Sequence, residues 1–291
     1  MKLLLNSKMS SKEESIYIVG RYNKFSRNLC QTPWIIDGVR RMESSVQDLI
    51  VNEIEKRVKY EKAKFSACGR EDVDVRMLGD GRPFVVELMK PEVNNISDQV
   101  LDEIEQEINT NCTEIKVRDL QLTVKEEVKV QLKLGETDKT KRYRALCCIN
   151  RPLTEMDFQK FQSIKDLTIN QKTPIRVLHR RSLLNRPRVI HRISAEKTED
   201  DHKFIIELTT EAGTYIKEFV HGDFGRSTPN LAEIMGDCRT DIIELDVIAI
   251  TMDWPKTKAI KSATPTEGTK AKIENDCTND FPCTKRFKHE N

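Results

Sequence analysis

Residues 69–84 read GREDVDVRMLGDGRPF, a stretch in which acids and arginines alternate between glycines. The acids are Glu71, Asp72 and Asp74, the arginines are Arg70, Arg76 and Arg82, and the glycines are Gly69, Gly79 and Gly81. Glycines around locally compensated charge are typical of a turn-rich surface loop. A functional site with a carboxylate can have the same pattern. Other parts of the sequence are needed to distinguish these two interpretations.

On both sides of this stretch the sequence predicts helices and strands in irregular order. Residues 44–60 and 97–109 repeat apolar residues every three or four positions after a serine, which is typical of capped amphipathic helices. Alternating or apolar runs predict strands at 15–19, 83–88, 113–117, 143–149, 175–179, 188–194, 203–210 and 241–250. This order predicts an α+β fold with a mixed, largely antiparallel central sheet flanked by helices.

One segment fits two kinds of secondary structure. Residues 126–136, EEVKVQLKLGE, alternate apolar and polar side chains as a strand does, yet they consist of good helix formers. Both assignments remain open from the sequence alone.

Composition limits the class of protein. The chain has 291 residues and is 37% hydrophobic, enough to bury one large core or two small ones. No apolar run reaches the roughly 18 residues of a membrane span, and the N-terminal residues lack a secretory pattern. Eight cysteines without a CxxC pair indicate reduced thiols and no metal site. We therefore expect a cytoplasmic or nuclear protein without a membrane partner.

The predicted elements divide the chain into three parts. We expect a flexible N-terminus at 1–15 and a catalytic domain at 16–255, built from two closely packed halves at about 16–150 and 151–255. The segment 256–291 is rich in Lys, Thr, Ser, Pro and Asn and shows no apolar period. It cannot bury enough surface to offset its ordering entropy, so we expect a disordered basic tail.

A block of arginines indicates a polyanionic partner. Residues 176–192, RVLHRRSLLNRPRVIHR, contain six arginines and no acid. Guanidinium groups bind phosphate through paired hydrogen bonds and stack on bases. Interleaved Val, Leu and Ile predict a hairpin-like element, so we expect contact with nucleic acid there, the alternative being a solvated basic edge strand. Residues 21–27, RYNKFSR, repeat the basic and aromatic theme more weakly.

Four short segments, in order along the chain, resemble the motifs of tRNA pseudouridine synthases. They are GRED at 69–72, TKRYRAL at 140–146, LTTEAGTYIKEFV at 208–220 and IIELDV at 242–247. TPIRVLHRR (173–181) resembles a strand of the enzymes that modify the tRNA T-arm. One branch, the archaeal and eukaryotic T-arm synthases of the Pus-ten type, is similar in RYNKFSRNL (21–29), GREDVDVRMLG (69–79), GRPF (81–84), TYIKEF (214–219) and GDFGRSTPNL (222–231). The resemblance spans about residues 16–255 and implies a pseudouridine synthase-like catalytic fold with an RNA-binding cleft.

The resemblance implies a role for three residues far apart in the sequence. Asp72 corresponds to the catalytic aspartate, Tyr143 to the aromatic residue against the target base, and Lys217 to the basic partner of the aspartate. Many pseudouridine synthases have arginine where this chain has Lys217. Burial alone would neutralise a carboxylate, so a cation is needed beside it. We expect Asp72 in a cleft, within ion-pair reach of Lys217 and beside Tyr143, with Asp74 as the rival carboxylate.

Further residues are assigned to substrate binding. By resemblance, Ile216 and Leu245 are apolar neighbours of the uracil pocket, and Arg70 positions a phosphate or braces its loop. Arg180 and Arg181 belong to the arginine block and are expected to bind RNA phosphates.

The resemblance implies an isomerase that converts uridine to pseudouridine in the T-arm of tRNA. It implies tRNA as the partner, no cofactor and no metal, and we expect a monomer. The alternative is a non-catalytic RNA-binding or processing module that retains the fold. A deaminase would need zinc-ligand spacing, and a methyltransferase a glycine-rich nucleotide loop, and the sequence contains neither.

Overall fold

The computed structural model describes residues 15–258 except 138, 180 and 237. The N-terminus that we expect to be flexible, apart from residue 15, and the predicted tail from residue 259 onward lie outside the described residues. Within them, none of the helices combines the length and the apolar composition needed to cross a membrane.

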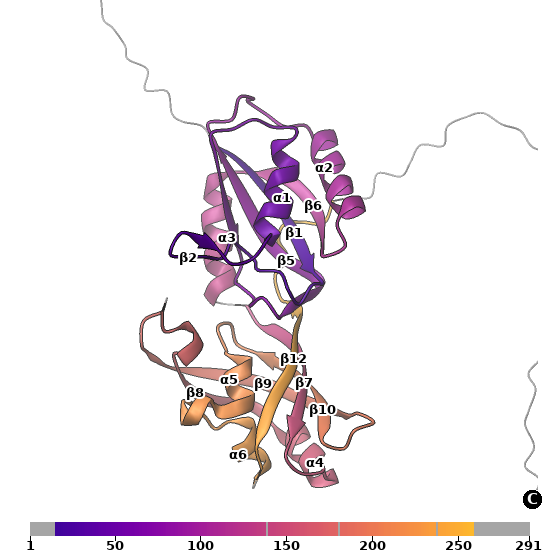
Figure 1. Cartoon of the computed structure of the whole chain (residues 1–291), viewed down its shortest axis with the longest axis vertical. Helices are drawn as coiled ribbons and strands as arrows, with labels where there is room; N and C mark the ends of the chain where they lie inside the picture. The colour runs from indigo at the N-terminus through magenta and orange to yellow at the C-terminus, as the bar shows by residue number, and fades with distance from the viewer. Residues whose placement is uncertain (1–14, 138, 180, 237, 259–291) are drawn as a thin grey trace, which may run out of the picture. The chain divides into compact units, whose positions relative to one another are not determined.

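A sheet of ten strands forms the centre of the fold (Figure 1). Its order is β11-β8-β9-β10-β7-β12-β5-β1-β6, with β4 paired to β5 as well. The strands are β1 (Ile16–Lys24), β4 (Lys62–Ala67), β5 (Arg76–Met89), β6 (Ile115–Thr123), β7 (Lys141–Ile149), β8 (Lys165–Lys172), β9 (Asn185–Lys197), β10 (Lys203–Thr210), β11 (Ser227–Thr228) and β12 (Thr240–Ile250). All these pairings are antiparallel except β12 with β5. The predicted α+β class with a mixed, largely antiparallel sheet is confirmed.

The two helices predicted from apolar periodicity are α1 (Val46–Glu55) and α2 (Asp98–Asn111). Each begins after its serine, because the hydroxyl oxygens of Ser45 and Ser97 accept hydrogen bonds from backbone N–H groups of the first turn. Their apolar faces are buried, and Figure 1 shows both helices against β1, β5 and β6. Burial of one apolar stripe on the sheet is what stabilises helices of this length.

Three other helices and two short 3₁₀ turns complete the second part of the chain. They are α4 (Glu155–Ser163), α5 (Ile216–His221), α6 (Leu231–Met235), η1 (Ile175–Val177) and η2 (Gly222–Gly225). The ambiguous residues 126–136 lie in α3 (Lys125–Thr137), so helix propensity prevails over the alternating pattern there. A small hairpin of β2 (Ile35–Ile36) and β3 (Val39–Arg40) stands apart from the main sheet.

The structure corrects the interpretation of the arginine block. The predicted strand 175–179 is wrong, because residues 175–177 form η1 directly after Pro174. On one side β9 pairs with β8. The sequence does not predict β8, because its residues KDLTINQK are mostly polar and lack a strand pattern. The block is therefore not a hairpin, since its first half is η1 and a connecting loop and its second half runs along β9.

The stretch 69–84 divides into a loop and a strand. Residues 69–75 form an irregular loop, as the glycine-rich pattern predicts, but from Arg76 the chain is already β5. Gly79 and Gly81 lie inside this strand with φ of 57° and 74°. A side chain at Gly79 would place its Cβ 2.1 Å from the carbonyl oxygen of Ile248. Gly79 permits β5 and β12 to approach each other, and Gly81 permits β5 to approach β1, since a Cβ there would lie 2.7 Å from the carbonyl oxygen of Tyr22.

The sheet is continuous across the two halves that we predict. β7, which precedes residue 150, lies between β10 and β12, which follow it. β12 in turn pairs with β5 through Asp246 and Val247. Strands from distant parts of the chain thus meet at β12, although the boundary between the halves itself stays a prediction.

Candidate active site

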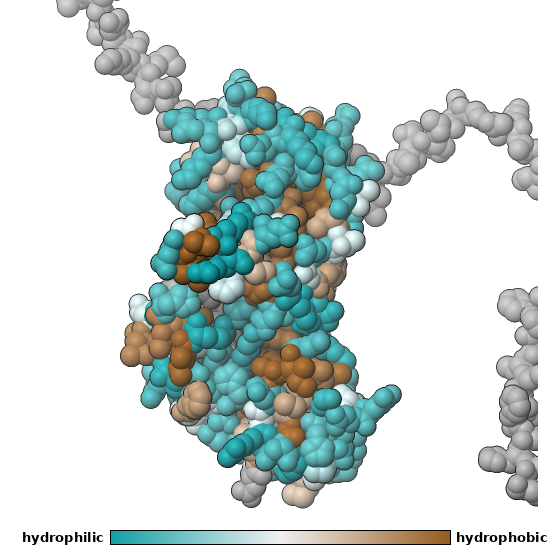
Figure 2. Space-filling view, in the orientation of Figure 1, coloured by the Kyte–Doolittle hydropathy of each residue, from teal (hydrophilic) through white to brown (hydrophobic). Residues whose placement is uncertain are grey.

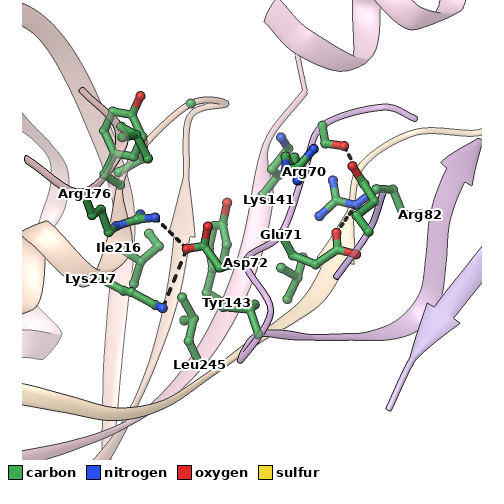
Figure 3. Close-up of a pocket in the computed structure, with 18 of the residues that line it drawn as sticks. Arg70, Glu71, Asp72, Arg82, Lys141, Tyr143, Arg176, Ile216, Lys217 and Leu245 are labelled. Atoms are coloured by element: carbon green, nitrogen blue, oxygen red, sulfur yellow. Dashed lines mark hydrogen bonds and ion pairs between the residues drawn. The ribbon is translucent and has the colours of Figure 1, made fainter. Parts of the chain in front are cut away.

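A cavity of about 710 Å³ lies where these strands meet. Its wall includes the loop 69–75, β7, β12, the η1 segment and the start of α5. Figure 3 shows Asp72 and Glu71, neighbours in sequence, pointing to opposite sides of this region. The volume lies within the range of pockets that enclose small ligands.

Among the described residues, Arg176 and Lys217 hold Asp72 on one side of the cavity. The Oδ2 atom of Asp72 lies 2.6 Å from Nη1 of Arg176 and 3.6 Å from Nζ of Lys217. The ion-pair reach that we predict between Asp72 and Lys217 is therefore confirmed. Lys217 makes shorter contacts to Asp74, at 2.8 and 2.7 Å to its two oxygens. Lys217 thus bridges both candidate carboxylates, and Arg176 is the nearer cation to Asp72.

A buried acid holds the side chain of Arg176 in place. Its Nε and Nη2 atoms donate hydrogen bonds of 2.7 and 3.3 Å to the carboxylate of Glu218, whose side chain is 2% exposed. Burial by itself would lower the pKa of Arg176, but the bonds to Glu218 and the charge of Asp72 hold this pKa above its ordinary value. Arg176 remains a cation in the site.

Asp74 is the more exposed of the two carboxylates, with 61% of its side chain accessible against 28% for Asp72. Partial burial of Asp74 acts to raise its pKa. The hydrogen bonds and the charge of Lys217 outweigh that effect and lower the pKa of Asp74. Asp74 is thus ionised but borders the solvent.

A buried lysine supports the backbone of the loop that carries Asp72. The ammonium of Lys24 donates hydrogen bonds to the carbonyl oxygens of Leu29, Asp72 and Val73, at 2.7, 3.1 and 2.7 Å. Lys24 is completely buried in β1. An ammonium group with three donors thereby binds three backbone carbonyls, of which that of Asp72 also accepts a hydrogen bond from the N–H of Val75.

A second buried network holds the other side of the same loop. Oε2 of Glu71 accepts a 2.7 Å bond from Nε of Arg82, and Oε1 accepts a 2.6 Å bond from the hydroxyl of Tyr22. The amide of Gln31 donates to that hydroxyl and to the carbonyl of Gly69, at 2.7 and 3.1 Å. This network fixes the position of Glu71 next to Asp72, whose side chain points the other way (Figure 3).

Aromatic and apolar side chains form the floor of the cavity. Tyr143 on β7 lines it and is nearly buried, with burial raising the pKa of its phenol to about 12. Ile216, the first residue of α5, and Leu245 on β12 are buried and also line the cavity. The predicted neighbours of Asp72 are all brought together, with the phenol uncharged at neutral pH.

Basic residues surround the opening. Arg70 and Arg181 are exposed and line the cavity, as do Arg186 and Arg188 of β9. Arg70 donates a 3.0 Å hydrogen bond to the hydroxyl of Thr32. The predicted substrate-binding residue Arg180 lies outside the described residues.

Comparison with known proteins identifies the family. The model of the family described as Pus10, C-terminal, matches residues 17–251. The chain belongs to this family. Curated relatives named tRNA pseudouridine synthase Pus10 are 51% identical in Homo sapiens and 40% identical in Thermofilum pendens. These matches cover 83% and 81% of this chain but 45% and 52% of the relatives, so this chain of the Pus10 C-terminal family spans about half their length.

Similarity to solved structures is weaker than similarity in sequence. The structure titled "Crystal Structure of a Cbf5-Nop10-Gar1 Complex" matches with a TM-score of 0.43 and 17% identity, over 79% of this chain and 48% of that one. A structure titled "Crystal structure of pseudouridylate synthase" matches with a TM-score of 0.29 and 13% identity, over 82% and 64%.

The sequence analysis of this Pus10 C-terminal chain missed the residues that support the site. Arg176 was assigned only to the polyanion footprint, and Glu218 was not singled out. Glu71 and Arg82 stand out only as charges of the stretch 69–84, and Lys24 only as part of the segment 21–27, because nothing in their spacing shows that they are buried. Acids and bases adjacent to a motif are ordinary in sequence, and only their burial reveals a supporting network.

No metal site coincides with the cavity in the described part of the chain. The group with suitable spacing there is Asp200, Asp201 and His202, and all three are exposed. None of them lines the cavity.

Proposed function

We propose that this chain is the catalytic domain of an isomerase that converts uridine to pseudouridine in the T-arm of tRNA. The proposal rests on Asp72, a carboxylate that faces a cavity beside two cations and Tyr143. Family membership supports it, since the curated relatives are named tRNA pseudouridine synthase. A mere RNA-binding module would not need an ionised carboxylate in a pocket that receives a polyanion.

The reaction requires an anion at the sugar. The bond between ribose C1′ and uracil N1 breaks, the base turns, and C1′ bonds to C5, which loses its proton while N1 gains one. The change is an isomerisation, so no electrons or water are consumed. Asp72 acts at the ribose, and both attack on C1′ and removal of the C2′ proton need its carboxylate ionised. Arg176 and Lys217 place positive charge beside this carboxylate.

The target uridine has to leave its stack to reach Asp72. Flipping a base out of a folded arm costs a few kcal/mol, and stacking on an aromatic ring recovers about 1–3 kcal/mol. Tyr143 provides that ring, and Ile216 and Leu245 provide apolar edges at the same cavity. A phenol with a pKa of about 12 stays neutral, so it adds no negative charge beside Asp72.

The surface around the cavity suits a folded RNA. Exposed Arg70 and Arg181 would bind phosphates, with Arg180 as a further candidate. Figure 2 shows hydrophobic side chains beside β8, where Ile175, Leu178, Leu183 and Leu184 are 40–68% exposed. Structured RNA is recognised through its shape, its backbone and its unpaired bases, which a mixed basic and apolar surface can contact.

Tritium release tests the proposal. The chain is incubated with a tRNA transcript labelled with tritium at C5 of uridine, because isomerisation displaces this hydrogen. We expect release by the wild type, none by Asp72→Ala, and wild-type rates for Asp201→Ala, a control in an exposed acid away from the cavity. Binding without tritium release by the wild type would reject catalysis and favour a non-catalytic RNA-binding module.

We also place the chain in the cytosol or nucleus as a monomer. The six cysteines in the described residues are reduced thiols, which suits a reducing compartment. Fractionation and analytical ultracentrifugation test the two statements separately.

A further inference from the structure

We propose that Arg176, held by Glu218, is the positioning residue that orients the Asp72 carboxylate. The proposal rests on the function proposed above and assigns this role to a residue of the arginine block. Arg176 contacts Asp72 at 2.6 Å, whereas Lys217 lies 3.6 Å from it. The cation expected by resemblance is therefore the more distant of the two.

The geometry of Arg176 limits its freedom. Its Nε and Nη2 atoms bind Glu218, which leaves Nη1 to donate to Asp72. Glu218 lies in α5 with a nearly inaccessible side chain, so its own position is set by packing. A planar guanidinium held on one edge presents its remaining N–H groups in a fixed direction. The orientation of Asp72 is thereby coupled to the helix that begins at the cavity.

Lys217 has a different task in this arrangement. Both oxygens of Asp74 lie within 2.8 Å of its ammonium, and Asp72 is only a secondary neighbour. An ammonium is a point charge without a preferred plane, so it balances charge without fixing the carboxylate plane. Lys217 balances the negative charge of Asp74, and Arg176 sets the orientation of the Asp72 carboxylate.

A competing interpretation treats Arg176 as one more phosphate ligand of the block. Its guanidinium is already engaged by Glu218 and Asp72. A phosphate there would bring a third anion next to two carboxylates, which is electrostatically unfavourable. Arg181 in the same block is exposed at the rim of the cavity and suits phosphate binding better.

Steady-state kinetics separate the two interpretations. Tritium release from tRNA is measured for the full chain and for Arg176→Gln, Arg176→Lys, Glu218→Gln and Arg181→Gln. A charge-assisted hydrogen bond corresponds to about 10- to 100-fold in rate, so we expect a drop of that size in kcat for Arg176→Gln, with KM within about threefold. Arg176→Lys should recover part of kcat. Arg181→Gln should instead raise KM and leave kcat near the wild-type value.

Two further measurements separate positioning from a merely structural role. Glu218→Gln should lower kcat, and adding it to Arg176→Gln should have little further effect, since both act through one contact. Free guanidinium at low concentration should restore part of kcat to Arg176→Ala, whereas urea at equal concentration should not. A rise in KM with unchanged kcat in Arg176→Gln, or an additive double variant, would overturn the proposal.

The proposal can fail separately from the proposed function. If the wild type releases tritium and Arg176→Gln keeps its kcat, the positioning role is wrong and the activity stands. If the wild type releases none, urea unfolding of Arg176→Gln, Asp72→Asn and the double variant still measures the contact. We then expect the effect of the double variant on the unfolding equilibrium constant to differ by about twofold or more from the product of the two single effects. A double-variant effect equal to that product would reject the contact.

Discussion

The ammonium of Lys24 lies 3.1 Å from the carbonyl oxygen of Asp72, whose carboxylate faces the cavity. A residue of β1, 48 positions away, therefore holds the backbone from which the proposed catalytic group projects. Burial of Lys24 lowers its pKa from 10.5 to about 8, although nearby acids act in the opposite direction. The hydrogen bonds that support the loop 69–75 therefore come from a group, the ammonium of Lys24, that loses its proton at a lower pH than an ordinary lysine.

This linkage predicts how stability depends on pH. The folded pKa of Lys24 lies below the unfolded one, so the unfolded chain binds the proton more tightly between about pH 8 and 10.5. Below about pH 8 the buried charge of Lys24 destabilises the folded state by its full amount, and this destabilisation disappears as the pH rises. The free energy of unfolding of the wild type should therefore rise relative to Lys24→Met, by up to about 3 kcal/mol at pH 10.5. Urea denaturation at several pH values tests this, and parallel curves for the two proteins would contradict it.

Glu71 and Arg82 predict a large cost for losing one member of a buried pair. Their side chains are 0% and 2% exposed, with 2.7 Å between Oε2 and Nε. Glu71→Gln leaves the guanidinium without a buried counter-charge, which costs about 3 kcal/mol or more in unfolding free energy. Glu61→Gln, which removes an exposed partner of Lys90, serves as the control and should cost less than about 1 kcal/mol. Equal losses in chemical denaturation would show that Glu71 has no special role.

The two candidate carboxylates should differ in their importance for the reaction. We expect Asp72→Asn to lower kcat by about 10³-fold or more, as removal of a central catalytic group does. Asp74→Asn should lower it by about tenfold or less, because Asp74 is more exposed and serves mainly as the partner of Lys217. Single-turnover tritium release measures both. The reverse order would move the catalytic role to Asp74.

Two glycines with similar backbone angles predict different costs for an added methyl group. Gly79 has a φ of 57°, and a Cβ there would meet the Ile248 carbonyl at 2.1 Å. Gly38 has a φ of 76° with no atom within 4 Å of such a Cβ. Gly38→Ala should cost about 1 kcal/mol for its backbone conformation alone, whereas Gly79→Ala should cost several kcal/mol because β5 and β12 must separate. Thermal unfolding of both variants gives the comparison, and similar melting temperatures would contradict it.

Local patterns predicted the fold best where one segment carries its own signal. α1 and α2 follow from a serine cap and an apolar period, and most predicted strands lie inside observed ones. β8 was missed because its polar residues lack a strand pattern, and η1 was mistaken for a strand because its apolar residues imitate one. β8 is a strand because it pairs with β9, and such pairing depends on residues distant in sequence. Residues 175–177 instead form a 3₁₀ turn directly after Pro174.

The sequence by itself determined the fold class, the capped helices and the set Asp72, Tyr143, Lys217, Ile216 and Leu245 that lines one cavity. The motifs name these five residues through their resemblance to the motifs of a known family. Only the tertiary structure decided that Arg176 lies nearer to Asp72 than Lys217 does and that Lys24 and Glu71 hold the loop in place. Burial, distance and hydrogen-bond direction arise where strands separated by tens to hundreds of residues come together, and no local pattern contains them.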